Sequence, residues 1–184
     1  MTERIAVLSV VGRHKSGKTT LIEGLLGQLR RRGLRVATLK HDAHGFDIDI
    51  PGKDSWRHRQ AGAELVVIAS PGRLALVQEL RREEPLAALL ELAAQRAPGI
   101  DLILTEGYRT GPLPKIEVVE HGRGAPLTAG EPALLALAAD RLPFEEAPPG
   151  VPCFDRNDYA GLAELLLARL PELRRLGPLP PTRP

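Results

Sequence analysis

The sequence predicts an α/β fold: one mostly parallel sheet flanked by helices. Short, continuous apolar runs rich in β-branched residues alternate with segments of helical spacing, a pattern typical of strands that are buried on both faces. The chain has 184 residues, of which 43% are hydrophobic and 26% charged, as expected for a globular protein. We therefore expect a single domain over residues 1–170 and a Pro-rich C-terminal tail over residues 171–184.

The first strand and the first helix are the clearest elements of the sequence. Ile5–Val11 is an apolar run that predicts a central strand, and a polar turn follows over Gly12–Thr20. Thr19–Arg32 has helical spacing and ends in three arginines before Gly33, as the helix dipole and a glycine C-cap favour. With a second strand over Leu34–Leu39, these segments form a β–α–β unit.

The middle of the chain combines a long polar loop with short elements. Residues 40–55 are polar and lack periodicity, and long loops in compact domains are often functional. A short helix is expected over Ser55–Ala61, with Asp54 as its N-cap. Leu65–Ala69 predicts another buried strand, and Leu74–Val77 predicts a short one.

The remaining segments continue the alternation of helices and strands. Pro85–Arg96 has helical spacing, with the proline acceptable in the first turn. Strands are expected over Leu102–Thr105, Ile116–Val119 and Leu134–Ala138. The last helix is expected over Tyr159–Leu170. No internal repeat divides the chain.

Composition argues against several classes of partner. Twenty-five Lys and Arg residues against 23 Asp and Glu leave a formal charge of only +2, so no broad basic field points to nucleic acid. The single Cys153 cannot form an internal disulfide, which suits a reducing compartment. No apolar run is long enough to span a bilayer. We expect a cytoplasmic protein that binds neither nucleic acid nor membrane.

The turn after the first strand carries a phosphate-binding pattern. It matches G-x-x-x-x-G-K-[ST] at every fixed position, between a predicted strand and a predicted helix, where this pattern has a mechanism. The glycines allow main-chain amides to curl around a phosphate, the lysine supplies a charge, and the threonine hydroxyl can ligate Mg²⁺. We assign phosphate binding to Gly12, Arg13, His14, Lys15, Ser16, Gly17, Lys18, Thr19 and Thr20.

Two carboxylates are expected near the bound phosphates. Glu106 follows the strand that ends at Thr105, and Asp42 follows the strand that ends at Leu39. Ligands of open parallel sheets bind beyond the carboxyl ends of the strands. We therefore assign a magnesium site to Thr19, Glu106 and Asp42, and catalytic roles to Glu106 and Asp42 through the ion or the attacking water.

The polar loop contains a second group of interest. His41 and His44 precede Asp47 and Asp49, a spacing that can bind zinc. Because no cysteine or third histidine lies nearby to complete a closed site, a polar loop that faces the substrate is the favoured interpretation.

Together these residues resemble the molybdopterin-guanine dinucleotide biosynthesis adaptor protein B (MobB) family. The resemblance extends from Ile5 to about Val119, and the histidine/aspartate block is its most specific part. Tyr108 stands where family members often have Phe. The matching segments are the phosphate loop, residues 40–49 (KHDAHGFDID), residues 51–57 (PGKDSWR), residues 61–63 (AGA), residues 104–108 (LTEGY) and residues 114–117 (PKIE).

The resemblance implies a P-loop NTPase that binds GTP and Mg²⁺ and assists the guanylyltransferase that attaches GMP to molybdopterin. It also implies a homodimer, weak GTPase activity and an Asp42–Asp49 block beside the site, which makes Asp49 a further catalytic candidate. No Asn-Lys-x-Asp motif for reading guanine is present, so the preference for GTP depends on the resemblance.

Two other functions use the same residues. A kinase or ligase of a small molecule would use Asp49 or Asp47 as its base and would show rapid, substrate-dependent turnover. A nucleotide-bound interaction module would bind without turnover.

Overall fold

The computed structural model describes residues 4–43 and 45–175. These residues form two compact units, one of which contains the chain up to His41 and from Leu86 onward, while the other comprises Asp42–Pro85. The predicted single domain over residues 1–170 therefore contains two compact units. The reason is local: the polar loop leads into a hairpin that forms its own small sheet.

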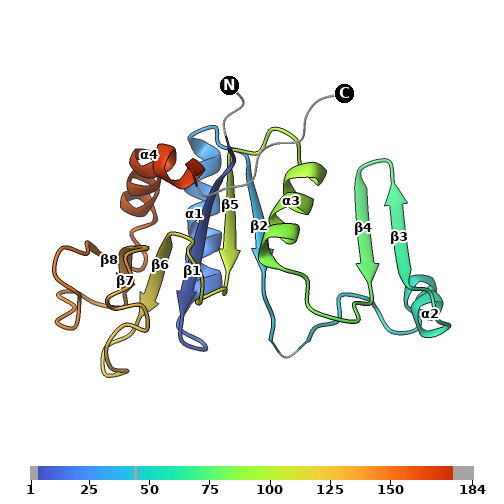
Figure 1. The fold of residues 1–184 in the computed structure, drawn as a ribbon, viewed down its shortest axis with the longest axis horizontal. Helices are drawn as coiled ribbons and strands as arrows, with labels where there is room; N and C mark the ends of the chain where they lie inside the picture. The colour runs from blue at the N-terminus through green and yellow to red at the C-terminus, as the bar shows by residue number, and fades with distance from the viewer. Residues whose placement is uncertain (1–3, 44, 176–184) are drawn as a thin grey trace. The chain divides into compact units, whose positions relative to one another are not determined.

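The larger unit is the predicted α/β domain (Figure 1). Its six strands are all parallel, in the order β2-β5-β1-β6-β7-β8. Each predicted strand of this unit is confirmed to within about two residues, a normal difference at element ends. The elements are β1 (Ala6–Gly12), α1 (Lys18–Arg31), β2 (Val36–Lys40), α3 (Leu86–Arg96), β5 (Leu102–Glu106), β6 (Lys115–Val119), β7 (Leu134–Ala139), β8 (Cys153–Asp155) and α4 (Tyr159–Arg175).

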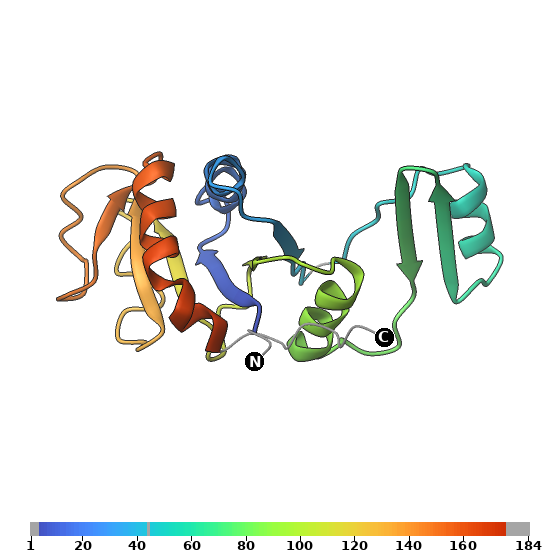
Figure 2. The same cartoon turned by 90° about the horizontal axis from the view of Figure 1, so that it is seen from above.

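Alternation along β1 creates a core on both faces of the sheet. Ala6, Leu8 and Val10 pack in the cluster that contains residues of α1 and α4. Ile5 and Val7 pack on the opposite face with residues of α3. Figure 2 shows α1 and α3 on opposite sides of β1. Burial on both faces explains why β1 is a continuous apolar run.

Helix α1 ends as the sequence predicts. Gly33 has φ +82° and its amide donates to the Arg30 carbonyl oxygen at 3.0 Å, while the Leu34 amide donates to the Leu29 carbonyl oxygen at 3.1 Å. This pair of hydrogen bonds is a Schellman motif, which needs a left-handed residue at the position of Gly33.

The smaller unit contains helix α2 (Asp54–Gln60) and the antiparallel hairpin of β3 (Leu65–Ser70) and β4 (Arg73–Gln78). The expectation that β3 is a buried strand is wrong, because Val66 is its only buried residue. Asp54 is not the N-cap either: it lies in the first turn and Lys53 precedes the helix. An apolar run predicts a strand, but only a second layer of structure can bury both of its faces.

The final helix is longer than predicted. Helix α4 continues through Pro171 to Arg175, instead of ending at Leu170. Leu173 is fully buried in the same core as Leu166, so burial beyond the proline favours the longer helix. The rest of the predicted tail, residues 176–184, lies outside the described part of the chain.

Strand β8 is the element that sequence reasoning missed. It has three residues, all half-buried, which is too short for periodicity to be recognised. No helix within the described ranges is long and apolar enough to cross a membrane.

Candidate functional site

The turn between β1 and α1 has the backbone of a phosphate loop. Gly12, Lys15 and Gly17 all have positive φ, at +143°, +61° and +97°. Gly12 also passes close to the neighbouring strand, since a Cβ there would lie 2.5 Å from the Val118 carbonyl oxygen. Backbone amides at the start of α1 complete the loop, so this geometry can hold an anion.

The lysine of the motif lies across this loop. The Lys18 ammonium donates to the carbonyl oxygen of Arg13 at 2.7 Å and to that of Gly12 at 3.2 Å. Burial lowers the pKa of Lys18, the nearby Glu106 carboxylate opposes that shift, and Lys40 adds to it. The Lys18 side chain is therefore held across the loop by two of its carbonyl oxygens.

Glu106 and Thr19 meet at the carboxyl edge of the sheet. Strand β5 pairs with β1 so that Glu106 lies beside Val10, at the level where the loop begins. The Thr19 hydroxyl lies 3.0 and 3.1 Å from the two carboxylate oxygens of Glu106, and Lys40 Nζ lies 3.7 Å from Oε1. A hydroxyl and a carboxylate in contact are ligands that suit Mg²⁺, so these two predicted residues fit that ion.

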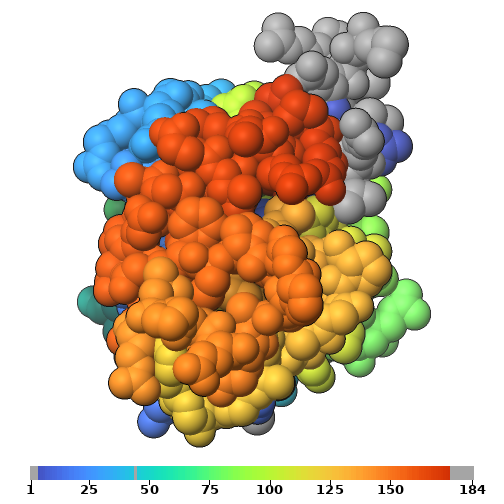
Figure 3. Space-filling view, turned by 90° about the vertical axis from the view of Figure 1, so that its left-hand side faces the viewer, coloured from blue at the N-terminus to red at the C-terminus, as the bar shows by residue number. Residues whose placement is uncertain are grey.

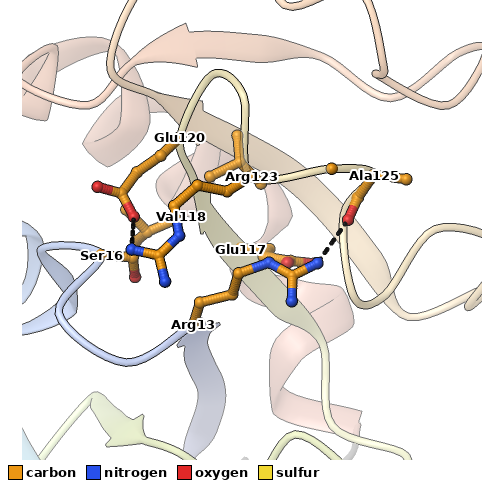
Figure 4. A pocket seen from close by; sticks show the side chains of 9 residues that line it. Arg13, Ser16, Glu117, Val118, Glu120, Arg123 and Ala125 are labelled. Atoms are coloured by element: carbon orange, nitrogen blue, oxygen red, sulfur yellow. Dashed lines mark hydrogen bonds and ion pairs between the residues drawn. The ribbon is translucent and has the colours of Figure 1, made fainter.

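A small pocket lies behind the loop, against β6 (Figure 4). The Ser16 hydroxyl lines it and is the one buried side-chain polar atom without a hydrogen bond among the described residues. Arg13 donates from Nη2 to the Ala125 carbonyl oxygen at 3.3 Å, and Arg123 pairs with Glu120 at 3.2 Å. Arg13 thus connects the phosphate loop to the segment that follows β6.

The same segment is held by a buried carboxylate that sequence reasoning missed. Glu117 accepts hydrogen bonds from the amides of Leu127 and Thr128, at 2.7 and 2.9 Å, and from the Thr128 hydroxyl at 2.6 Å. Glu117 is 1% exposed, so these bonds offset the cost of burying its charge. It lies within the PKIE segment, but a strand residue of this kind has no recognisable motif of its own.

A buried lysine on the same strand is a second residue without a sequence signal. Lys115 is fully buried; it donates to the carbonyl oxygens of Gly111 and Leu113 and pairs with Glu131 at 3.0 Å. These contacts join the segments on either side of β6.

The other predicted catalytic residues belong to the smaller unit. Asp49 accepts hydrogen bonds from the Ser55 hydroxyl at 2.8 Å and from Arg59 Nε at 3.3 Å. The Arg59 guanidinium also pairs with Asp47 at 2.7 Å and with Glu79 at 2.9 Å. Asp49 therefore has structural partners within its own unit. Its catalytic role, like that of Asp42, stays a prediction.

The histidine pair is only partly described. The His41 amide donates to the Glu106 carbonyl oxygen at 3.0 Å, and its ring lies 4.9 Å from the ring of Tyr108. His44 lies outside the described residues. Within the ranges that the structure covers, no group of three or more His, Cys, Asp or Glu side chains is arranged to hold a metal ion.

Comparisons with known proteins agree with this arrangement. The family model described as "Molybdopterin guanine dinucleotide synthesis protein B" (MobB) matches residues 7–140. The chain is 36% identical to the molybdopterin-guanine dinucleotide biosynthesis adapter protein of Haemophilus influenzae, over 76% of this chain and 78% of the relative. It is 34% identical to the adapter protein of Escherichia coli, over 89% and 92%.

Solved structures show the same fold. The crystal structure of Bacillus subtilis MobB superposes with a TM-score of 0.69 at 29% identity, covering 90% of this chain and 98% of that one. A crystal structure of molybdopterin-guanine biosynthesis protein B gives 0.64 at 33% identity, covering 88% and 98%. The phosphate loop on a parallel sheet is thus a P-loop NTPase fold, which implies nucleotide binding. The family model, the relatives and the solved structures all agree, and the chain belongs to the MobB family.

Proposed function

We propose that this protein is a GTP-binding accessory protein with slow GTPase activity that assists the guanylyltransferase attaching GMP to molybdopterin. The observation that carries the proposal is the phosphate loop with Lys18 across it and Thr19 in contact with Glu106. The family supports the molybdenum cofactor pathway, and the resemblance supports GTP as the nucleotide.

Magnesium fits the same geometry. Thr19 and Glu106 would hold the ion, which would neutralise charge on the β- and γ-phosphates. Lys18 would contact the phosphates directly once its bonds to the loop carbonyls are exchanged for bonds to the anion. Arg13 is bonded to the Ala125 carbonyl and must leave it before it can act on a phosphoryl group, which supports slow hydrolysis.

Calorimetry of GTP binding with Mg²⁺ tests the proposal. Lys18→Ala removes a charged donor to the phosphates, a contact that contributes about 1.5–3 kcal/mol, so the affinity should fall about 10- to 100-fold. Arg169→Ala is the control, because Arg169 is an exposed residue of α4 that pairs with Glu172. An unchanged GTP affinity in Lys18→Ala would contradict the proposed role of the loop in phosphate binding.

Turnover separates the proposal from its alternatives. A small-molecule kinase or ligase would release phosphate rapidly and only with its second substrate. An accessory GTPase would turn over slowly by itself and would raise the yield of the dinucleotide when the guanylyltransferase is added. A pure interaction module would support the transferase equally well as Lys18→Ala.

A homodimer is the second part of the proposal, and the hairpin supports it. One face of the β3–β4 sheet presents Leu65, Val67, Leu74 and Leu76, all between 39% and 52% exposed. Two-stranded hairpins with an open apolar face are marginal alone. We assign this face to a second copy of the chain, as the resemblance implies.

A further inference from the structure

A second hollow lies beside the phosphate loop, between the start of α1 and the turn after β8. Lys15, Gly17 and Thr20 line it from the loop and helix, and Arg156, Asn157 and Tyr159 line it from the turn and from the start of α4. All of these residues belong to the larger unit. Figure 3 shows that α1 (light blue) and α4 (red) lie side by side.

The position suits the rest of a nucleotide. A triphosphate held by the loop amides leaves its sugar and base to lie beyond the start of α1. Lys15 and Gly17 belong to both the motif and this hollow, so the two sites are continuous. Strand β8 ends at Asp155, at the same carboxyl edge of the sheet as the loop, which is where ligands bind in such folds.

The wall of the hollow is held in place by local contacts. The Tyr159 ring packs directly over Gly24 of α1, where any Cβ would overlap it. The Asn157 amide donates to Asp155 Oδ1 at 2.8 Å, which closes a tight turn, and the Arg156 amide donates to the Ala139 carbonyl oxygen at 2.7 Å. The turn is therefore formed before a ligand arrives.

The polar groups of this wall are mainly donors. Arg156 carries five N–H donors and no acceptor, and Lys15 carries three donors. The Asn157 carbonyl oxygen accepts the Tyr159 hydroxyl at 3.3 Å, which leaves its NH₂ group for a ligand. The Asp158 carboxylate is engaged as the cap of α4, accepting the Gly161 amide at 2.9 Å.

Guanine and adenine differ in what they present to such a wall. Guanine offers two adjacent acceptors, O6 and N7, whereas adenine places an amino donor beside N7. Arginine and lysine accordingly pair with guanine. In adenine, the amino group is itself a donor, so it would face the donors of this hollow and find no acceptor there. From this chemistry we infer that the hollow is the base subsite and that Arg156, with Asn157 and Lys15, selects guanine. The inference rests on the proposed function, since it assumes that the loop holds the phosphates.

The experiment measures three affinities by calorimetry with Mg²⁺: GTP, ATP and inorganic tripolyphosphate. The native chain should prefer GTP over ATP. Arg156→Met keeps the apolar stem and removes the donors, so GTP affinity should fall about 10- to 100-fold, ATP affinity should fall less, and tripolyphosphate affinity should stay unchanged. Arg169→Ala, which removes an arginine elsewhere on α4, should change none of the three.

A second variant reverses the chemistry at an exposed position. Asn157→Asp replaces the NH₂ donor with an acceptor at nearly constant size, so the ratio of GTP to ATP affinity should fall even if its charge weakens both. Thermal midpoints of the variants should match the native chain, because the main-chain bonds of the turn are retained.

Three results would overturn the base subsite: no preference for GTP in the native chain, equal losses for all three ligands in Arg156→Met, or no change in either variant. In each case tripolyphosphate binding that depends on Lys18 would leave the phosphate loop assignment intact. Tripolyphosphate binding that survives Lys18→Ala would instead contradict the proposed function itself.

Discussion

Glu106 shows how a single residue acquires its role through strand pairing. It is 87 positions from Thr19 in sequence, yet the parallel pairing of β5 with β1 puts their oxygens 3.0 Å apart. Lys40 approaches the same carboxylate from β2, on the other side of β5. Hydrogen bonds and charge thus converge on one carboxylate at the edge of the sheet, which is the arrangement needed to orient a metal ligand.

Removing the charge of Glu106 should affect hydrolysis more than binding. Glu106→Gln keeps the shape of the side chain but weakens its interaction with the ion, so Mg²⁺-dependent GTP hydrolysis should fall about 10- to 100-fold. Nucleotide affinity should change much less, because the loop amides and Lys18 are retained. Phosphate release and calorimetry measure the two effects, and equal losses would argue against a magnesium role.

Arg59 joins three carboxylates of the smaller unit. It pairs with Asp47 in the polar loop, with Asp49 in the same loop, and with Glu79 after β4. Its side chain is 13% exposed. The hydrogen bond from Arg59 holds the pKa of Asp47 below its ordinary value of 3.8. The two aspartates of the histidine/aspartate block therefore have a structural role in this unit.

The lowered pKa of Asp47 predicts how the smaller unit responds to acid. A carboxyl group with a depressed folded pKa contributes stability that is present above its unfolded value and is lost as the pH falls through the folded value. Fluorescence of Trp56, the only tryptophan, reports on this unit because it lies in α2. The native signal should change only below the ordinary pKa of Asp47.

Arg59→Met is the comparison for that titration. Without its partner, Asp47 should titrate near its ordinary value, so the change in Trp56 fluorescence should move to higher pH. Arg57→Met, in the same helix, should leave the titration as in the native chain. Identical titrations of Arg59→Met and the native chain would mean that the Arg59 cluster does not stabilise this unit.

At the scale of elements, the contact of α1 with α4 depends on one glycine. The Tyr159 ring occupies the place of a Cβ at Gly24, whereas a Cβ at Gly27, on the same helix, would meet nothing within 4 Å. Both glycines lie in the interior of α1, where alanine is the better helix former. The two positions therefore separate packing from helix propensity.

Alanine at these two glycines should have opposite effects. Gly24→Ala should destabilise the fold by about 1–3 kcal/mol, since the new methyl group forces Tyr159 away from α1. Gly27→Ala should stabilise it by about 0.5–1 kcal/mol. Chemical denaturation measures both changes. Equal gains at the two sites would show that the Tyr159 ring moves away at no cost.

At the scale of the whole molecule, the two units differ in how completely they are buried. The larger unit encloses β1 between helices on both faces. The smaller unit has α2 near one face of its hairpin and an open apolar row on the other, made by residues such as Val67 and Leu76, which face each other across the hairpin. An open face of this kind is typical of an interface.

A charge in that row should separate the copies. Val67→Glu places a carboxylate among apolar residues of the hairpin. Light scattering should therefore find a monomer for this variant and the proposed dimer for the native chain. Ser70→Glu, at the end of the same strand, is the control and should leave the dimer intact. A native chain that is monomeric at high concentration would contradict the proposed assembly.

Local patterns in the chain determined the helices, the phosphate loop and every strand of the larger unit except β8, because each depends on neighbours in sequence. Examples are the apolar run of β1, the helical spacing along α1 and the glycines of the phosphate loop. The histidine/aspartate block, the most specific part of the family resemblance, is likewise a local pattern. Two predictions were wrong: that the last helix ends at Leu170, and that β3 is buried. In the first case burial of Leu173 outweighs the local effect of the proline, and in the second no covering layer buries the strand.

Only the tertiary structure decided which distant residues share a site. The sequence had already assigned Glu106 and Thr19 to one site, and the structure shows their side chains in contact. The buried Glu117 and Lys115, and the hollow between α1 and the turn at Arg156, depend on strand order. Strand order is set by which apolar faces can be buried together, and this is a property of the whole chain. A sequence pattern predicts that a strand exists, whereas its neighbours in the sheet follow from packing.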